Sequence, residues 1–196
     1  MFFSSDQELP RVTEKGFDLV DIPKETWTKI LEIYELLKPY STPEDHPGIT
    51  DFIHDKEKNV VADILDMNIH WEKRDIIHEE MGEILKTWIE GKYALEKTAI
   101  YGIRSYRNGA ILEMHKDRVE THHISAIIIV DRAGENWPLA IKDHEGNIHE
   151  VYADPGQMIL YESAVCSHGR PTEFKGEYFR NFFLHYKFKD YEFKSL

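Results

Sequence analysis

The feature that most restricts the fold is a change in the pattern of apolar residues after Lys97. Short segments rich in β-branched and aromatic residues follow there, in place of the longer amphipathic segments before it. Turn-forming groups such as Arg107-Asn-Gly109 and Asp154-Pro-Gly156 separate these segments. Short strands at this spacing are typical of a two-sheet sandwich or jelly roll. We expect strands at residues 98–106, 111–114, 122–130, 139–141, 149–152, 157–162 and 177–188.

The first half of the chain is expected to support this β region with helices. Apolar residues recur at helical spacing in 27–37 and again in 71–88, which predicts two amphipathic helices that pack through one face. The alternating segment 17–22 is expected to pair at a sheet edge, and the polar, turn-rich residues 40–70 to form a surface excursion. We therefore predict one mainly β domain over 1–196, with helical and irregular support in 1–96 and the β core in 97–188.

Composition limits the partners and the compartment. The formal net charge is −12, which argues against nucleic acid as the main partner, because phosphate binding needs a basic surface, and which favours a basic or neutral substrate. No apolar run reaches the roughly 18 residues of a membrane span, so no membrane partner is expected. The N-terminus lacks the features of a signal peptide, and Cys166 is the only cysteine. We predict a cytoplasmic protein.

The clearest chemical motif is His115-Lys116-Asp117, which follows an expected strand. In an extended segment, positions i and i+2 point to the same face, so the imidazole and the carboxylate can reach one small cation while Lys116 points away. A second imidazole from elsewhere would complete two histidines and one carboxylate. That arrangement is associated with non-heme Fe(II), because it leaves coordination positions open.

Among the eleven histidines, His168 is the candidate for the third ligand. It ends an apolar run and is followed at once by Gly169-Arg170-Pro171, so its imidazole is expected at a strand end, projecting into the mouth of the sandwich. His185 lies deep in the last expected strand and is interpreted as a buried, hydrogen-bonded histidine. Solvated or structural roles are assigned to the remaining histidines, namely His46, His54, His70, His78, His122, His123, His144 and His149.

These motifs, in this order, resemble those of the Fe(II)- and 2-oxoglutarate-dependent oxygenases, and within them the prolyl 4-hydroxylase-like branch. The resemblance covers roughly residues 98–186. It implies a double-stranded β-helix, a form of jelly roll, whose major sheet is buttressed by the N-terminal helices. The motifs that carry it are Tyr106-Arg-Asn-Gly109, His115-Lys-Asp117-Arg118, Asp154-Pro-Gly156 through Tyr161, and His168-Gly-Arg-Pro through Asn181-Phe-Phe-Leu-His185-Tyr186.

The resemblance also implies a role for individual residues. His115, Asp117 and His168 would hold the iron, and Tyr106, at the position nine residues before the first ligand, would contact 2-oxoglutarate. Prolyl hydroxylases often carry a second tyrosine three residues before that ligand, where this chain has Leu112. Binding of the cosubstrate must therefore differ in detail from that branch.

A basic residue is needed for the distal carboxylate of 2-oxoglutarate, because a carboxylate in a largely dry barrel requires a charged, hydrogen-bonding partner. The family's usual position falls close to Glu177 and Tyr178, neither of which is cationic. We favour Arg180, whose guanidinium can bind a carboxylate bidentately, over Lys175 in the preceding turn, with Arg170 as a third candidate.

The implied activity is hydroxylation of an unactivated C–H bond with Fe(II), 2-oxoglutarate and O2, and ascorbate is a further candidate cofactor. The substrate is expected to be a peptide or protein in the prolyl hydroxylase-like case, and otherwise a small molecule. Arg118, directly after the metal motif, either contacts the substrate or forms an ion pair. Two alternatives remain open: a cupin-type metal protein of another reaction class, and a non-catalytic metal-binding module of the same fold. The sequence predicts no oligomeric state.

Overall fold

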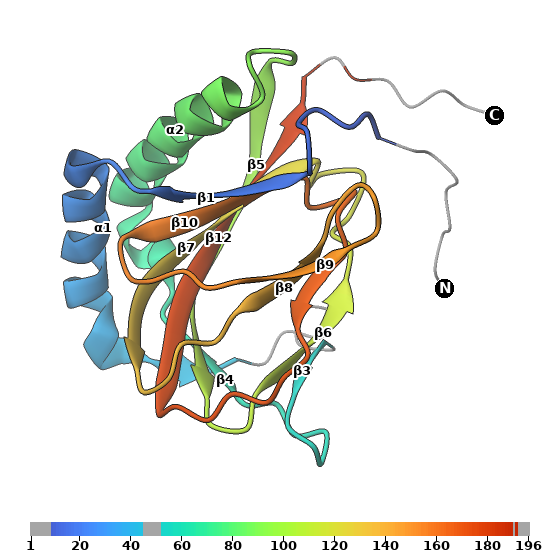
Figure 1. Cartoon of the computed structure of the whole chain (residues 1–196). Helices are drawn as coiled ribbons and strands as arrows, with labels where there is room; N and C mark the ends of the chain where they lie inside the picture. Colours follow the sequence, from blue (N-terminus) through green and yellow to red (C-terminus); the bar gives the residue numbers. More distant parts are fainter. Residues whose placement is uncertain (1–8, 45–51, 190, 192–196) are drawn as a thin grey trace.

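The computed structural model describes residues 9–44, 52–189 and 191, and Figure 1 shows two β-sheets with both long helices on the outer face of one of them. Each helix forms where the sequence has apolar residues at helical spacing. Neither is long and apolar enough, in the part of the chain described, to cross a membrane. The elements are β1 (Phe17–Asp21), α1 (Lys24–Leu37), η1 (Lys38–Tyr40), β2 (Thr42–Pro43), β3 (Ile53–His54), β4 (Ala62–Ile64), η3 (Met67–His70), α2 (Trp71–Trp88), β5 (Leu95–Arg107), β6 (Ile111–His115), β7 (Ile124–Ala133), β8 (Leu139–Lys142), β9 (Ile148–Val151), β10 (Gln157–Tyr161), β11 (His168–Arg170) and β12 (Tyr178–Phe188).

The strands form two antiparallel sheets. The larger has the order β1-β10-β7-β12-β5-β4-β2, and the smaller has the order β3-β6-β11-β8-β9. Most neighbouring strands are not consecutive in the sequence, as in a jelly roll, although β8 and β9 form a hairpin. The expected double-stranded β-helix with helical support is therefore confirmed, and β1 pairs at the edge of the large sheet as predicted.

Residues 42–64 differ from the predicted surface excursion. β2 and β4 extend the large sheet beyond β5, while β3 pairs with β6 of the small sheet. Ile53 and Ala62 are fully buried, as is Leu65 just after β4. These apolar anchors draw the segment into both sheets, and residues 45–51 of the predicted excursion lie outside the described part of the chain.

Two apolar layers follow from the alternation of side chains along the central strand β12. Phe182 and Leu184 pack toward the helices, in the cluster that includes Ile30 and Leu85. Phe179 and Phe183 belong to the cluster between the two sheets. Because successive strand residues face opposite sides, every second residue of β12 faces the interior between the sheets, where the site described below lies.

Buried His78 makes the stability of the fold depend on pH. It lies on α2 with its ring 4.8 Å from that of Tyr186, and burial lowers its pKa from 6.5 to about 4. Between these two pKa values the unfolded chain binds the proton and the folded chain does not, so stability is lost as the pH falls from about 6.5 toward 4.

We expect a His78→Phe variant, which keeps a ring but cannot titrate, to lose less stability on acidification than the wild type. The wild type should lose about 2 kcal/mol more of its free energy of unfolding between pH 7 and pH 5, measured by urea denaturation without metal. The comparison cancels the other histidines, which are common to both proteins. Equal losses in the two proteins would contradict this role of His78.

Candidate metal centre

Two strands of the small sheet place the two predicted imidazoles side by side. His168 opens β11 and pairs in register with His115, the last residue of β6, and the ring centroids are 4.6 Å apart. Gly169 allows this close approach, since a Cβ there would lie 2.7 Å from the carbonyl oxygen of Glu113 and 2.8 Å from that of Leu112. His168 therefore begins a strand, whereas the sequence placed it at a strand end.

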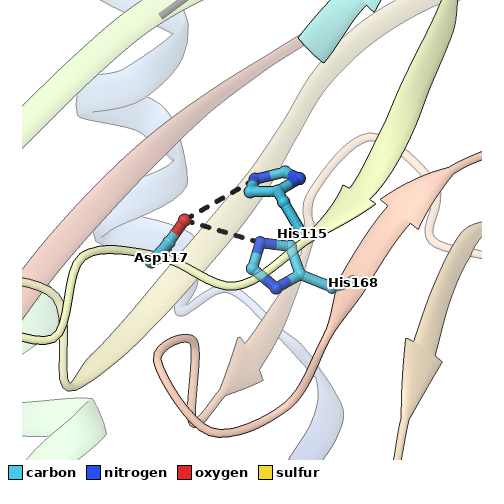
Figure 2. Close-up of side chains that lie close together, drawn as sticks. All are labelled: His115, Asp117 and His168. Atoms are coloured by element: carbon cyan, nitrogen blue, oxygen red, sulfur yellow. Dashed lines mark ion pairs between the residues drawn. The ribbon is translucent and has the colours of Figure 1, made fainter. Parts of the chain in front are cut away.

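Asp117 completes the group from the connection that follows β6 (Figure 2). Its backbone N–H donates to the carbonyl oxygen of Ser163 at 3.0 Å, which holds the turn in place. Its Oδ1 lies 3.7 Å from Nε2 of His115 and 3.7 Å from Nε2 of His168. One ligand atom from each of the three residues lies within 4.8 Å of the others, so the structure brings together the three residues expected from sequence.

The imidazoles are oriented by hydrogen bonds on their far side. Nδ1 of His115 donates to the carbonyl oxygen of Glu113 at 2.8 Å, and Nδ1 of His168 donates to that of Cys166 at 2.9 Å. A proton on Nδ1 leaves the lone pair on Nε2, the atom that faces Asp117. Both rings are thus held in the tautomer that a metal ion requires.

The electrostatics of the three groups also suit a cation. Burial lowers the pKa of His168 to about 4 and is the main cause that lowers the pKa of His115. Burial raises the pKa of the Asp117 carboxyl group, because its negative charge is poorly solvated there. Neutral imidazoles are the metal-binding form, and a bound cation would stabilise the carboxylate that burial disfavours.

These three residues line a cavity of about 340 Å³ between the sheets. The ring of Phe52 stacks on that of His115 with the centroids 5.0 Å apart, and Tyr161 meets His168 edge to face at 4.6 Å. The remaining lining residues are Ala99, Tyr101, Arg104, Leu112, Lys116, Arg118, His122, Ile127, Phe183 and His185. The cavity is therefore an aromatic and apolar chamber with the metal group on one wall.

The residues predicted to bind 2-oxoglutarate lie in different parts of the fold. Arg180 lies on the helix side of β12, where its Nε donates to Ser105 Oγ at 3.1 Å and its Nη1 bonds to Tyr34 of α1. The side-chain alternation of β12 sends Arg180 away from the cavity, and this corrects the sequence-based preference. Lys175 is exposed in the loop after β11 and does not line the cavity. Tyr106 is fully buried and lies between the sheets.

Arg104, which lines the cavity, already has an anionic partner. Its Nε and Nη2 donate to the two carboxylate oxygens of Glu44, each at 2.7 Å, and Tyr101 also donates to Glu44 at 2.6 Å. Glu44 is buried, so this is a bidentate ion pair shielded from water. The charge of Arg104 is therefore neutralised within the protein.

Arg170 is the buried cation without such a partner. It is 1% exposed, its Nε donates to the carbonyl oxygen of Trp137 at 3.2 Å, and its Nη1 has no hydrogen-bond partner among the described residues. Burial lowers the pKa of its guanidinium to about 10, and this effect outweighs the opposite, electrostatic effect of the nearby Tyr106 and Tyr161. Both polar atoms of the Asn181 side chain are also buried without a partner in the described chain. Unpaired buried polar groups of this kind indicate a missing anionic or polar ligand.

Sequence reasoning missed a hydrogen-bonded chain beside Asp117. Nδ1 of His185 lies 2.7 Å from Ser125 Oγ and 3.6 Å from Asp117 Oδ2, and Ser125 Oγ lies 2.6 Å from Ser163 Oγ. Ser163 is also the residue whose carbonyl oxygen holds Asp117. His185 lies two residues after Phe183 on β12, so both side chains face the cavity. The sequence would have shown this if the facing of one residue of that strand had been known.

Comparisons with solved structures agree with this architecture, although no protein-family model and no curated protein matches the sequence. AviO1 from Streptomyces viridochromogenes Tue57 superposes with a TM-score of 0.61 at 16% identity, over 91% of this chain and 92% of that one. A 2OG-Fe(II) oxygenase family oxidoreductase from Burkholderia pseudomallei gives 0.61 at 12% identity, over 88% and 84%. A Pseudomonas putida prolyl-4-hydroxylase gives 0.54 at 12%, over 87% and 92%.

The chain has the fold of the Fe(II)- and 2-oxoglutarate-dependent oxygenases, and the resemblance inferred from sequence is confirmed at the level of the fold. Its two histidines and one aspartate fit the iron of that class, because they present two Nε2 atoms and one carboxylate to a common point.

Proposed function

We propose that the protein is an Fe(II)- and 2-oxoglutarate-dependent oxygenase in which His115, Asp117 and His168 hold the iron. The observation that carries the proposal is the convergence of their ligand atoms within 4.8 Å at the wall of a largely apolar cavity. Bound Fe(II) and 2-oxoglutarate would supply O2-dependent oxidation of a C–H bond, with succinate and carbon dioxide as coproducts. The residues of the chain bind and orient the reactants and exclude water.

We assign the distal carboxylate of 2-oxoglutarate to Arg170, which lies near Tyr106. Like Asn181 and Tyr106, Arg170 lies behind the residues that line the cavity, so the distal carboxylate would reach past that lining. Arg170 follows His168 by two residues on β11, and its guanidinium packs over the rings of Trp137 and Phe179, which belong to the cluster between the two sheets. Its unpaired Nη1 offers a charged donor, and the side-chain amide of Asn181 offers a neutral one. Arg104 is not the anchor in this proposal, because Glu44 already binds its guanidinium.

The remaining residues have supporting roles. The carbonyl oxygens of Glu113 and Cys166 hold the imidazoles with Nε2 toward the metal. Tyr161 and Phe52 pack against the two ligand rings, which limits their rotation and shields them from water. A substrate would enter the cavity beside Phe52, Tyr101 and Phe183.

The test is an anaerobic titration of the purified protein with Fe(II) and then 2-oxoglutarate. We expect a visible charge-transfer band that needs both components, and succinate formation when O2 is admitted with ascorbate present to keep the iron reduced. Absence of both the band and succinate would overturn the proposal and leave a cupin-type metal protein or a non-catalytic module. A Zn(II)-loaded sample is the matched control, because Zn(II) has no redox chemistry.

A second candidate is the narrower one of a prolyl hydroxylase acting on a peptide or protein. It is favoured by the similarity to the Pseudomonas putida prolyl-4-hydroxylase over 87% of the chain. Incubation with proline-containing peptides should then add one oxygen atom to the prolyl residue, detected by mass spectrometry. Succinate release without oxygen incorporation in any peptide would contradict this candidate.

A further inference from the structure

The lining of the cavity carries two exposed cations that have no acidic partner among the residues the structure describes. Lys116 and Arg118 flank Asp117, both are exposed, and both contribute to the lining. Most lysines and arginines of the chain have a carboxylate within 4.0 Å, such as Lys58 with Glu113. Lys116 and Arg118 have none within the described residues. The extended geometry expected from sequence sent Lys116 away from the pair, but β6 ends at His115 and Lys116 contributes to the cavity wall.

The segment that carries these cations is held in place by the fold. The backbone N–H of Asp117 donates to Ser163, and those of Thr121 and His122 donate to the carbonyl oxygen of Arg118 at 3.2 and 2.8 Å. A turn closed by such bonds fixes where the two cationic side chains leave the backbone. Less conformational entropy is then lost when they bind an anion.

The other charges around the cavity balance one another once the site is loaded. The dication and the dianionic cosubstrate of the proposed function cancel, Asp117 is offset by Arg170, and Arg104 is paired with Glu44. Among the described lining residues, the charges of Lys116 and Arg118 remain unbalanced. Glu120, the other acidic residue of this short segment, does not line the cavity. The described part of the lining is thus positive beside Asp117, although the chain as a whole has a formal net charge of −12.

The opposite part of the lining is apolar and aromatic. Phe52, Tyr101 and Phe183 contribute rings to it. The volume of about 340 Å³ lies near the lower end of ligand pockets, which run from about 300 to 1,000 Å³, and it must also hold the cosubstrate. The remaining space suits a compact molecule better than a folded peptide segment.

We propose that the substrate is a small organic anion whose carboxylate or phosphate binds Lys116 and Arg118 while its apolar body packs on Phe52, Tyr101 and Phe183. This inference rests on the proposed function, since the charge balance includes the metal and 2-oxoglutarate. It replaces the basic or neutral substrate that the overall net charge favoured. The local field at a binding site, not the net charge of the chain, determines which ligand it attracts.

The test uses probes of nearly equal shape and different charge. 3-Phenylpropanoate, 2-phenylethyl phosphate and the neutral 3-phenylpropanamide are titrated calorimetrically into the anaerobic Fe(II) protein saturated with 2-oxoglutarate, which keeps the probes out of the cosubstrate site. We expect at least one anion to bind roughly tenfold more tightly than the amide, as one charge-assisted hydrogen bond predicts. This advantage should shrink as NaCl is raised.

A double variant, Lys116→Met with Arg118→Met, should bind the anions and the amide equally. The matched control is Lys24→Met with Lys142→Met, which removes the same charge from two exposed cations outside the cavity and should keep the tenfold difference. The charge-transfer band of each variant reports whether metal and cosubstrate are bound.

The outcomes separate the two proposals. Anions that bind no more tightly than the amide to a protein with a normal band would overturn the substrate class and leave the oxygenase proposal standing. If a proline-containing peptide perturbed the charge-transfer band and neither anion did, the proposed substrate class would also be overturned while the oxygenase proposal stood. Absence of the band in the wild type would overturn both proposals.

Discussion

We expect a His168→Ala variant to lose Fe(II) affinity by more than about 100-fold and to form no succinate. Loss of a residue that only orients a ligand typically costs 10- to 100-fold in metal affinity, and His168 is assigned as a ligand itself. The vacated position lies next to His115 in the strand pairing, and no other imidazole occupies that pair position. Anaerobic titration of Fe(II), followed by calorimetry, measures the loss.

His149→Ala is the control for this variant, because His149 is a histidine of the same sheet, on β9, that lies outside the cavity. It should bind Fe(II) as the wild type does. Thermal unfolding without metal shows whether His168→Ala is folded. A folded His168→Ala protein that retains wild-type Fe(II) affinity would remove this residue from the metal centre.

We expect an Arg170→Met variant to bind 2-oxoglutarate about 100-fold more weakly than the wild type, with no decrease in its free energy of unfolding without cosubstrate. Removing one partner of a buried, hydrogen-bonded charge pair costs about 2–5 kcal/mol of binding energy. In the free protein the same guanidinium is buried with no anion beside it, so an apolar side chain of similar length relieves a desolvation cost. Titration of 2-oxoglutarate into the Fe(II) protein and urea denaturation measure the two quantities.

We expect an Arg180→Met variant to lose stability without losing affinity for 2-oxoglutarate, the opposite of Arg170→Met. It removes the hydrogen bonds to Ser105 and Tyr34 on the helix side of the large sheet, so stability should fall by about 1 kcal/mol while cosubstrate affinity stays unchanged. If Arg180→Met weakened 2-oxoglutarate binding and Arg170→Met did not, the assignment of the anchor would be reversed. The pair of variants therefore decides between the two arginines directly.

Much of the architecture was predictable, because the signals are local. Alternating apolar residues bounded by turns located the strands after Lys97, and apolar spacing located both helices. The short strands β2, β3, β4 and β11 were missed, since runs of two or three residues carry no period. These strands are defined by their pairing with distant strands such as β5 and β6, and the residues within each short strand do not indicate those partners.

The grouping of the three candidate metal ligands was predictable for a different reason from the placement of the proposed anchor. His115 and Asp117 share a face through a spacing of two, and His168 is followed at once by the turn residues Gly169-Arg170-Pro171, so each signal is local in the chain. Choosing Arg170 over Arg180 required knowing which face of β12 meets the small sheet. That facing is set by contacts between distant strands. A shift of β12 by one residue would turn Arg180 toward the small sheet and favour it as the anchor.

The pairing of His115 with His168 has a consequence for how the protein reaches its native state. The two imidazoles meet only when β6 and β11 align with these residues opposite each other, and a slip of one position would turn one ring to the other face of the sheet. In the proposed function, an ion held by both strands would add its binding energy to the correctly aligned barrel alone. Bound iron would therefore disfavour chains in which these two strands are misaligned, before any substrate binds.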